Sequence, residues 1–162
     1  MVYLVRHAHA GRKADWQGPD LVRPLTRQGH LEALGLVEQL LGRSVGRVLS
    51  SSAHRCLQTV QPLANLLRLP VEPSDALGVE ASGADMLPLL TDPALHQAVL
   101  CTHGENIGEV FEELRGAGIR LSDRPRWAKG STWVIERDGP RWRGTYLEPR
   151  SVEPAAADRP PR

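Results

Sequence analysis

Residues 2–7 read Val2-Tyr3-Leu4-Val5-Arg6-His7, an apolar run that ends in a guanidinium and an imidazole. The run alternates too little for a half-exposed strand and is too short for a helix, so it indicates a buried strand over 2–6. A charged residue and a histidine at the exit of a buried strand contribute little to packing. Because ligands of open α/β sheets bind outside the carboxyl ends of the strands, Arg6 and His7 are candidate functional residues.

Strand and helix patterns alternate along the rest of the chain. Thr26 is typical of a helix N-cap, and leucines at helical spacing follow it as far as Gly42. Asp138-Gly139 is a favoured turn between antiparallel strands. The expected elements are a helix after Thr26, a strand over 47–50, a helix over 53–67, an extended segment over 70–73, a weak helix over 83–91, a strand over 98–101, a helix over 104–114 and strands over 131–137 and 141–147. We therefore predict an α/β fold, a mainly parallel central sheet flanked by helices with a C-terminal antiparallel hairpin.

The chain has 162 residues, enough for one domain with a substantial core. We place this domain at 1–148 and predict that the Pro- and Ala-rich segment 149–162 is a disordered tail. Residues 8–28 follow no clear pattern, and a structureless stretch of this length is commonly a substrate lid or binding loop.

The formal net charge is +1, which provides no general attraction to nucleic acid or to a membrane surface. Cys56 and Cys101 form neither a disulfide framework nor a CxxC site, and no targeting segment or membrane span is visible. We expect a cytoplasmic protein without nucleic-acid or membrane partners. The edge of the C-terminal hairpin could pair two copies of the chain, so a homodimer stays open.

Polar, reactive residues follow three of the expected strands. Arg6-His7 ends the first, Ser50-Ser51-Ser52 ends the second with Arg55 in the next helical turn, and Thr102-His103-Gly104 follows the strand over 98–101. Because parallel strands present their carboxyl ends at one edge, these clusters should meet around one cavity. Two histidines, two arginines and backbone N–H groups at helix N-termini make an anion site, and the natural anion is phosphate.

These motifs occur in an order typical of one protein family. They are Arg6-His7, then Ser51-Ser52-Ala53-His54-Arg55-Cys56-Leu57-Gln58-Thr59, then Thr102-His103-Gly104. With them, residues 1–147 resemble the histidine phosphatase (phosphoglycerate-mutase-like) superfamily. The signature Arg23-Pro24-Leu25-Thr26-x-x-Gly29 is similar to its small SixA-type branch.

Two further segments are similar to the histidine-phosphatase domain that follows a Nudix domain in some bacterial MutT-type enzymes. They are segment 11–16 and Lys129-Gly130-Ser131-Thr132-Trp133.

The resemblance implies that His7 is the nucleophile, which attacks phosphorus and becomes a transient phosphohistidine that water hydrolyses. It implies that Arg6 and Arg55 clamp the phosphoryl oxygens. His103 and backbone N–H groups around Gly104 would donate further hydrogen bonds to the same group. No metal or other cofactor is implied.

The resemblance also implies a carboxylic acid that protonates the leaving group, for which Glu80 is the best match and Asp85 the second. A phosphohistidine substrate has a leaving group that accepts a proton readily, so such an acid is not required for it. Lys13, within 8–28, is assigned to phosphate binding, where it would reach a second phosphate or the substrate rim. A flexible charged loop is the other interpretation of this segment.

We therefore predict a metal-independent phosphatase that acts on a phosphomonoester, such as a nucleotide or small metabolite, or on a phosphohistidine protein. The alternative is a non-catalytic module that binds a phosphorylated ligand on the same fold. A metal pair of His7 and His9 is less favoured, because no carboxylate stands at a matching strand end. The basic stretch over 120–129 is either a rim that attracts polyanionic substrates or a solvated loop.

Overall fold

A six-stranded sheet forms the centre of the computed structural model, which describes residues 1–121, 124–139 and 141–152. The strands are β1 (Val2–Arg6), β2 (Arg47–Ser50), β3 (Val71–Pro73), β4 (Ala98–Thr102), β5 (Thr132–Asp138) and β6 (Arg141–Leu147), in the spatial order β3-β2-β4-β1-β5-β6. The first four in this order are parallel neighbours, whereas β5 pairs antiparallel with both β1 and β6. The predicted mainly parallel sheet with an antiparallel C-terminal hairpin is confirmed.

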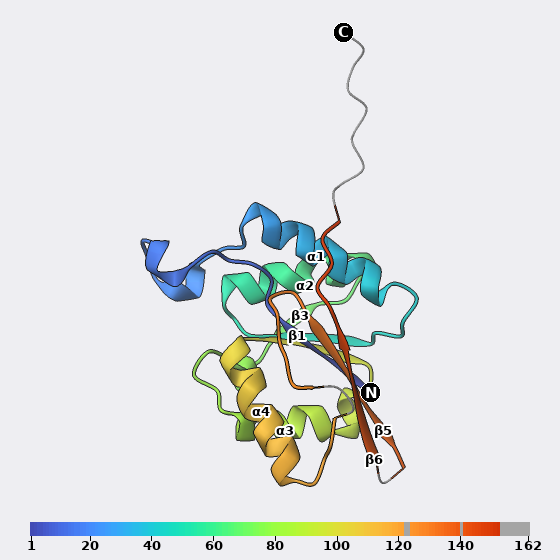
Figure 1. Cartoon of the computed structure of the whole chain (residues 1–162). Coiled ribbons are helices and arrows are strands. Elements are labelled where there is room, and N and C mark those ends of the chain that lie inside the picture. The colour runs from blue at the N-terminus through green and yellow to red at the C-terminus, as the bar shows by residue number, and fades with distance from the viewer. Residues whose placement is uncertain (122–123, 140, 153–162) are drawn as a thin grey trace.

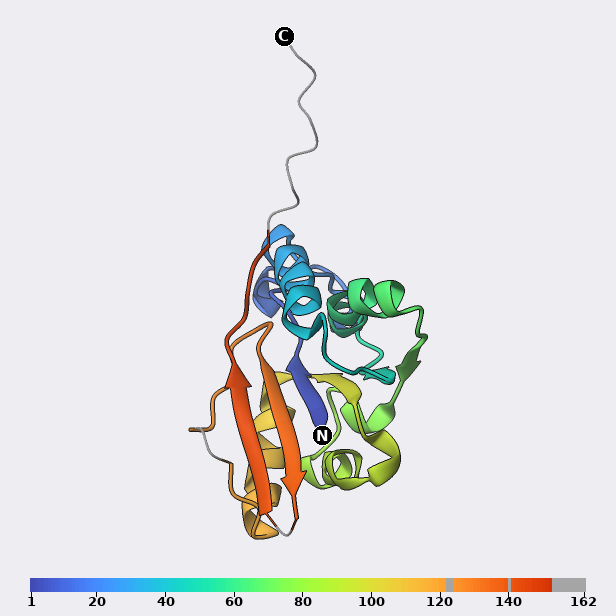
Figure 2. The same ribbon diagram turned by 90° about the vertical axis from the view of Figure 1, so that its right-hand side faces the viewer.

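Helices cover both faces of this sheet in pairs (Figures 1 and 2). The pair α1 (Arg27–Leu40) and α2 (His54–Leu67) covers one face, and the pair α3 (Gly83–Thr91) and α4 (Gly104–Gly116) covers the other. No helix in the described part of the chain is long and apolar enough to cross a membrane.

The first strand is apolar throughout because both of its faces are buried. Tyr3 and Val5 belong to the apolar cluster that also holds residues of α1 and α2. Val2 and Leu4 belong to the cluster that holds residues of α3 and α4. Alternate side chains of a strand point to opposite faces, so a strand between two helical layers needs an apolar residue at every position.

The segment between β1 and α1 contains two short 3-10 turns, η1 (Lys13–Asp15) and η2 (Asp20–Val22), where we expected no regular structure. Residues of the signature that begins at Arg23 hold the two ends of this segment together. Thr26 caps α1, because its Oγ1 accepts from the Gly29 N–H, and its own N–H donates to the carbonyl of His9. A Cβ at Gly29 would lie 2.1 Å from the His9 carbonyl oxygen, so this close approach requires glycine.

The C-terminal end of the described chain lies along α1. The Val152 N–H donates to the carbonyl of Leu31 at 3.1 Å, and the Arg150 carbonyl lies so close to Gly35 that a Cβ there would collide with it. The packed part of the chain thus extends beyond the boundary that we placed at 148. The remainder of the predicted tail, 153–162, lies outside the described residues.

The parallel strands decide where the functional side chains meet. The central strand β4 pairs with β1 on one side and β2 on the other. His7 follows β1, Ser51 follows β2 and His103 follows β4, so all three leave the sheet at the same edge. The backbone continues this pairing past the strands, since His7 N–H donates to Thr102 and Ser51 N–H donates to Cys101.

Candidate active site

Five of the predicted site residues surround one cavity of about 320 Å³ at this edge, and they are Arg6, His7, Lys13, Arg55 and His103. The two imidazole rings lie edge to face, with their centroids 5.4 Å apart. Residues nearly 100 positions apart in the chain therefore share a single polar cavity, as the strand-end argument requires.

The hydrogen bond of His7 determines which of its nitrogens can react. Its Nδ1 lies 2.8 Å from the carbonyl oxygen of Ala8, and a carbonyl only accepts. Nδ1 therefore carries the hydrogen, and in a neutral ring Nε2 keeps its lone pair. The residue after the histidine is fixed in turn, because the Ala8 N–H donates to Thr59 Oγ1 at 2.9 Å.

The surroundings of His7 keep its ring neutral. Its pKa is lowered to about 3, chiefly because the ring is buried and further because His103, Arg55 and Arg6 disfavour another positive charge nearby. The hydrogen bond to Ala8 opposes this shift without reversing it. His7 thus has an unprotonated nitrogen over the whole neutral pH range.

Arg6 and Arg55 each donate to a carbonyl group, yet each also has a buried donor without a partner in the described residues. Arg6 donates from Nη1 to the carbonyl of Trp127, and Arg55 donates from Nη1 to the carbonyl of Asp20. The Nε of each guanidinium is buried and has no hydrogen-bond partner in the described residues. An unpaired buried donor is costly, and an oxyanion in the cavity would supply the missing acceptors.

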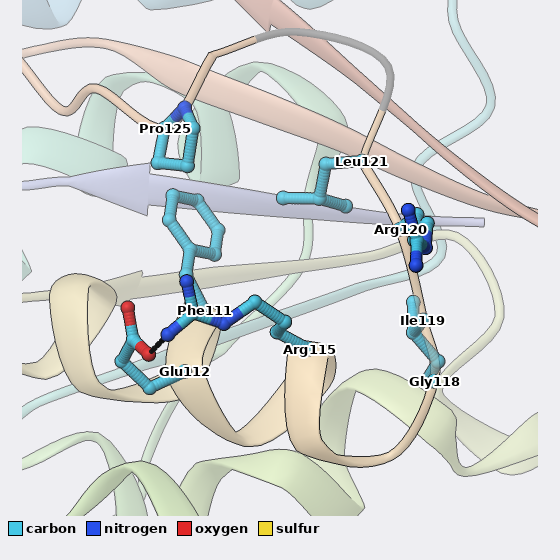
Figure 3. Close-up of a pocket in the computed structure, with 8 residues that line it drawn as sticks. All are labelled: Phe111, Glu112, Arg115, Gly118, Ile119, Arg120, Leu121 and Pro125. Carbon is cyan, nitrogen blue, oxygen red and sulfur yellow. Dashed lines mark hydrogen bonds and ion pairs between the residues drawn. The ribbon is translucent and has the colours of Figure 1, made fainter.

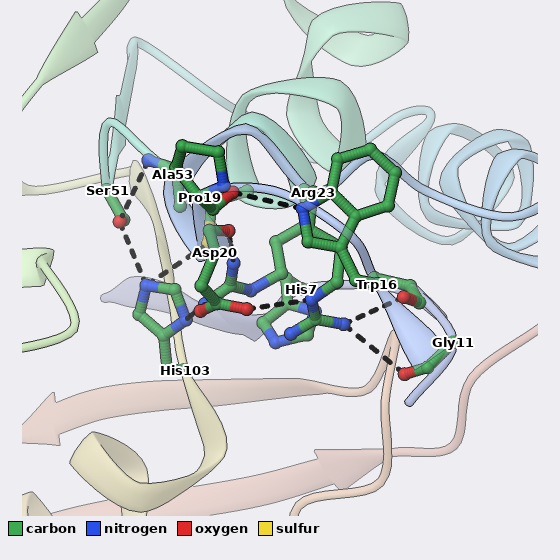
Figure 4. Close-up of polar contacts among 12 residues, drawn as sticks. His7, Gly11, Trp16, Pro19, Asp20, Arg23, Ser51, Ala53 and His103 are labelled. Atoms are coloured by element: carbon green, nitrogen blue, oxygen red, sulfur yellow. Dashed lines mark hydrogen bonds and ion pairs between the residues drawn. The ribbon is translucent and has the colours of Figure 1, made fainter. Parts of the chain in front are cut away.

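Both ring nitrogens of His103 have partners (Figure 4). Nδ1 lies 3.3 Å from Nη2 of Arg55, which only donates, so Nδ1 is the acceptor of the neutral ring. Nε2 then carries the hydrogen and donates to Ser51 Oγ at 2.9 Å. His103 is thereby held between Arg55 and Ser51, beside the ring of His7.

Asp20 and Arg23 belong to the same site, although we assigned them no role from the sequence (Figure 4). The Asp20 carboxylate accepts from Arg55 Nη2 at 3.0 Å and from Arg23 Nε at 2.8 Å. Burial raises the pKa of Asp20, but the hydrogen bond from Arg23 and the charge of Arg55 outweigh it, and the net pKa lies below the usual value. Arg23 stood within a family signature, whereas no pattern pointed to Asp20.

Lys13 and Gly104 lie at the site in different ways. Lys13, on η1, lines the cavity of His7. Gly104 is the first residue of α4, and a Cβ there would lie 2.7 Å from the guanidinium carbon of Arg6. The absence of a side chain at Gly104 therefore leaves room for the guanidinium of Arg6.

The two candidate acids have different surroundings. Glu80 does not line the cavity of His7 but an adjoining one of about 460 Å³, together with Ser51 and Asp20. Asp85 accepts from the N–H and the hydroxyl of Ser82 in the capping box of α3, which lowers its pKa. A carboxylate used in this way is a poor proton donor, so Glu80 remains the better candidate.

The geometry does not support a metal pair of His7 and His9. Nδ1 of His9 lies 2.8 Å from Thr26 Oγ1, where it helps to hold the start of α1. Among the described residues, no group of three His, Cys, Asp or Glu side chains is arranged to hold a metal ion.

The basic residues over 120–129 lie in three different places, and residues 122–123 are outside the described part of the chain. Arg120 lines a separate cavity of about 440 Å³ beside the C-terminal part of α4 (Figure 3). The Arg126 guanidinium lies 4.2 Å from the ring centroid of Tyr146 and pairs with Glu148. Lys129 lines the cavity of His7, so it is the member of this stretch that faces the site.

Comparison with known proteins agrees with this fold and site. Residues 2–80 match the model of the histidine phosphatase superfamily (branch 1). The match spans just under half of the chain, and with the strand order and the convergence of Arg6, His7, Arg55 and His103 it makes the chain similar to this superfamily.

Solved structures of SixA proteins are similar to the whole fold. A candidate phosphohistidine phosphatase SixA from Agrobacterium tumefaciens is 26% identical, with a TM-score of 0.68 over 91% of this chain and 97% of that one. A protein histidine phosphatase SixA in complex with tungstate is 23% identical, with a TM-score of 0.70 over 93% and 96%.

A sequence relative is an 8-oxo-(d)GTP phosphatase of Mycolicibacterium smegmatis, 33% identical over 156 residues. The match covers 91% of this chain but 48% of the relative, so this chain spans about half of that protein's length.

Proposed function

We propose that this chain is a metal-independent phosphatase that works through a phosphohistidine on His7. The observation that carries the proposal is the state of His7, a buried neutral imidazole whose Nε2 lone pair is left free by the bond from Nδ1 to Ala8. Two buried guanidinium N–H groups without partners, on Arg6 and Arg55, belong to the same cavity. A nucleophile beside unused donors for an oxyanion is the arrangement that phosphoryl transfer needs.

The reaction takes two steps. The Nε2 lone pair of His7 forms a bond to phosphorus, while the leaving oxygen departs with the electrons of its bond to phosphorus and takes up a proton. Glu80 is our candidate donor of that proton. Water then attacks phosphorus and gives a proton to the carboxylate of Glu80, which restores the acid, while the electrons of the P–N bond return to Nε2 and inorganic phosphate is released. Arg6, Arg55 and His103 stabilise the phosphoryl oxygens in both steps, and such donors are each worth about 2.7–4 kcal/mol when tested by removal.

Two substrate classes agree with the relatives. One is a phosphomonoester or nucleotide, since the M. smegmatis relative is named an 8-oxo-(d)GTP phosphatase. The other is a protein phosphohistidine, since the similar structures include SixA proteins named for that substrate. The alternative function, a module that binds a phosphorylated ligand without hydrolysing it, uses the same cavity but makes no use of the free Nε2 of His7.

The proposal is tested by measuring release of inorganic phosphate from p-nitrophenyl phosphate, nucleotides and a phosphohistidine peptide. We expect turnover without added metal, inhibition by vanadate, and loss of at least about 10³-fold in kcat in His7→Ala. His54→Ala, which removes an exposed histidine at the start of α2, is the matched control and should keep full activity. Wild-type turnover in His7→Ala refutes the nucleophile, and tungstate binding without turnover of any substrate favours the binding module.

A further inference from the structure

The cavity of His7 continues into a second cavity. The walls of both cavities include Lys13, Asp20 and Val79, so the two cavities adjoin at these residues. The second cavity, of about 460 Å³, is the larger, and Glu80 lies in its wall. A phosphoryl group held against His7 therefore has room for a sizeable leaving group on the side of Lys13.

The first cavity carries more positive charge than one phosphoryl group requires. Its wall has six cationic residues and two acidic ones, namely Arg6, Arg12, Lys13, Arg23, Arg55 and Lys129 against Asp20 and Glu105.

The crowding of like charges is visible at Lys129. Its pKa is lowered, first by burial and then by the charges of Arg6 and Arg23. A phosphoryl dianion balances two of the cations, Asp20 pairs with Arg55 and Arg23, and Arg12 pairs with Asp15, so with Glu105 a smaller positive surplus is left. The surplus favours a substrate with a further anionic group beside the one that reacts.

The second cavity has the opposite character. Its wall holds the carboxylates of Asp75 and Glu80 and the aliphatic side chains of Leu21 and Val79, which are 52% and 45% exposed. Carboxylates accept hydrogen bonds from N–H and O–H groups and repel phosphate. Exposed apolar side chains that gather at one site commonly mark a binding surface. The second cavity therefore fits a neutral, flat group that carries hydrogen-bond donors.

We infer that the two cavities together bind a nucleoside polyphosphate. The terminal phosphoryl group lies against His7, the next phosphate lies beside Lys13, and a base with N–H donors lies in the second cavity with Asp75 and Leu21. This inference rests on the proposed phosphatase function and names its substrate class. The histidine side chain of a phosphoprotein has no second anionic group, so it would leave the surplus cations unused.

The test compares KM values for guanosine triphosphate, guanosine monophosphate, inorganic tripolyphosphate and p-nitrophenyl phosphate, with a phosphohistidine peptide as a fifth substrate. We expect the wild type to have a KM for guanosine triphosphate at least about tenfold below those for the monophosphate and p-nitrophenyl phosphate. Lys13→Ala should raise the KM for guanosine triphosphate by about tenfold more than the KM for p-nitrophenyl phosphate. Arg115→Ala, which removes an exposed cation about 16 Å along α4 from Gly104, should change neither.

Binding of the base in the second cavity is tested separately. Asp75→Ala should raise the KM for guanosine triphosphate several-fold more than the KM for tripolyphosphate, which has no base. Equal effects of Lys13→Ala on all substrates, or a phosphohistidine peptide hydrolysed with a higher kcat/KM than guanosine triphosphate, overturn the inference. If the wild type hydrolyses none of the five substrates, the proposed function itself fails, which is a different outcome.

Discussion

The imidazole of His7 keeps a free lone pair because the ring is buried. The strand that precedes it is covered on both faces, so the ring leaves the sheet in a place with little water. Burial disfavours the imidazolium, and the Ala8 carbonyl chooses the tautomer. Neither the neutral state of the ring nor its tautomer depends on a carboxylate beside His7.

The low pKa of His7 links stability to pH. In the unfolded chain the ring takes up a proton near its ordinary pKa of about 6.5, whereas in the folded protein it does so at about 3. The stability that this group contributes is complete above the unfolded pKa and is lost as pH falls toward 3. The loss is about 1.4 kcal/mol for each pH unit in this window.

His7→Asn removes this titration and keeps a polar side chain of similar size. Between pH 6.5 and 5, the free energy of unfolding should therefore fall by about 2 kcal/mol more in the wild type than in the variant. Urea unfolding at the two pH values measures this difference. Parallel pH dependences in the two proteins would contradict a neutral buried His7.

Asp20 occupies donors that a phosphate would use. Asp20→Asn keeps its shape but removes a negative charge from the cavity, so an oxyanion should bind more tightly. We expect the inhibition constant for vanadate to fall by about fivefold, equivalent to ~1 kcal/mol. Glu38→Gln, which removes an exposed carboxylate of α1 away from the cavity, is the control. Weaker inhibition of Asp20→Asn would instead mean that Asp20 chiefly orients Arg55 and Arg23.

Sequence could predict the site residues that follow the strand ends. Of the residues that reach the site from the segment between β1 and α1, it predicted Lys13 but not Asp20 or Arg23. The convergence of His7, Arg55 and His103 follows from strand direction alone. Asp20 comes from a segment without periodicity, so nothing in the local pattern fixes where its carboxylate points. Ser51 was visible as a strand-end hydroxyl, but its bond to His103 depends on side-chain rotamers.

At the scale of elements, the loop after β1 and the helix α1 depend on each other. The loop carries the Ala8 carbonyl that fixes His7, and its next carbonyl, of His9, lies against Gly29 of α1. Glu32 of the same helix accepts from the His9 N–H at 2.8 Å. The helix thus supports the loop that positions His7.

Gly29→Ala tests this dependence. The added methyl group would overlap the His9 carbonyl, so either α1 or the loop must move, at a cost of about 1–3 kcal/mol in the free energy of unfolding. Because the displaced loop carries the hydrogen-bond partner of His7, we also expect a lower kcat. Gly116→Ala, at the end of α4 where nothing lies within 4 Å, is the matched control.

Chemical unfolding of both variants, together with kcat on p-nitrophenyl phosphate, measures the effect. The control should keep the wild-type activity and stability, or gain up to about 1 kcal/mol from the better helix propensity of alanine. Equal stability of the two variants would show that the contact between α1 and the loop is not tight.

Most elements were predictable because their signals are local. Thr26 marks the start of α1 through its own hydroxyl, and Asp138-Gly139 marks the end of β5, where Asp138 pairs with Arg141 of β6 and Gly139 follows with a φ of +59°. The segment between β1 and α1 was not predictable in detail, because its two 3-10 turns depend on Arg23, which donates to the carbonyls of Ala10 and Gly11. Tertiary contacts of this kind leave no periodic pattern.

At the scale of the whole molecule, a chain with a formal net charge of +1 concentrates its positive charge at one end of the sheet. The repulsion among these groups is a cost of folding that a bound anion relieves. Oxyanions should therefore stabilise the protein, by about 2.7 kcal/mol at a concentration 100 times the dissociation constant.

Thermal unfolding with increasing tungstate or vanadate measures this linkage. The rise in Tm should follow the occupancy of the site and should shrink at high ionic strength, because added salt screens the charges. In Arg55→Ala the stabilisation should be largely lost. An equal rise in that variant would place the bound anion elsewhere on the molecule.

The most direct measurement is the chemical identity of the trapped intermediate. The wild type, mixed with a ³²P-labelled substrate and quenched in alkali within one turnover, should carry acid-labile phosphate on Nε2 of His7, and His7→Ala should carry none. Label on Nδ1 of His7, label on another residue, or turnover with no labelled protein at any time would contradict a mechanism through the free nitrogen of this imidazole.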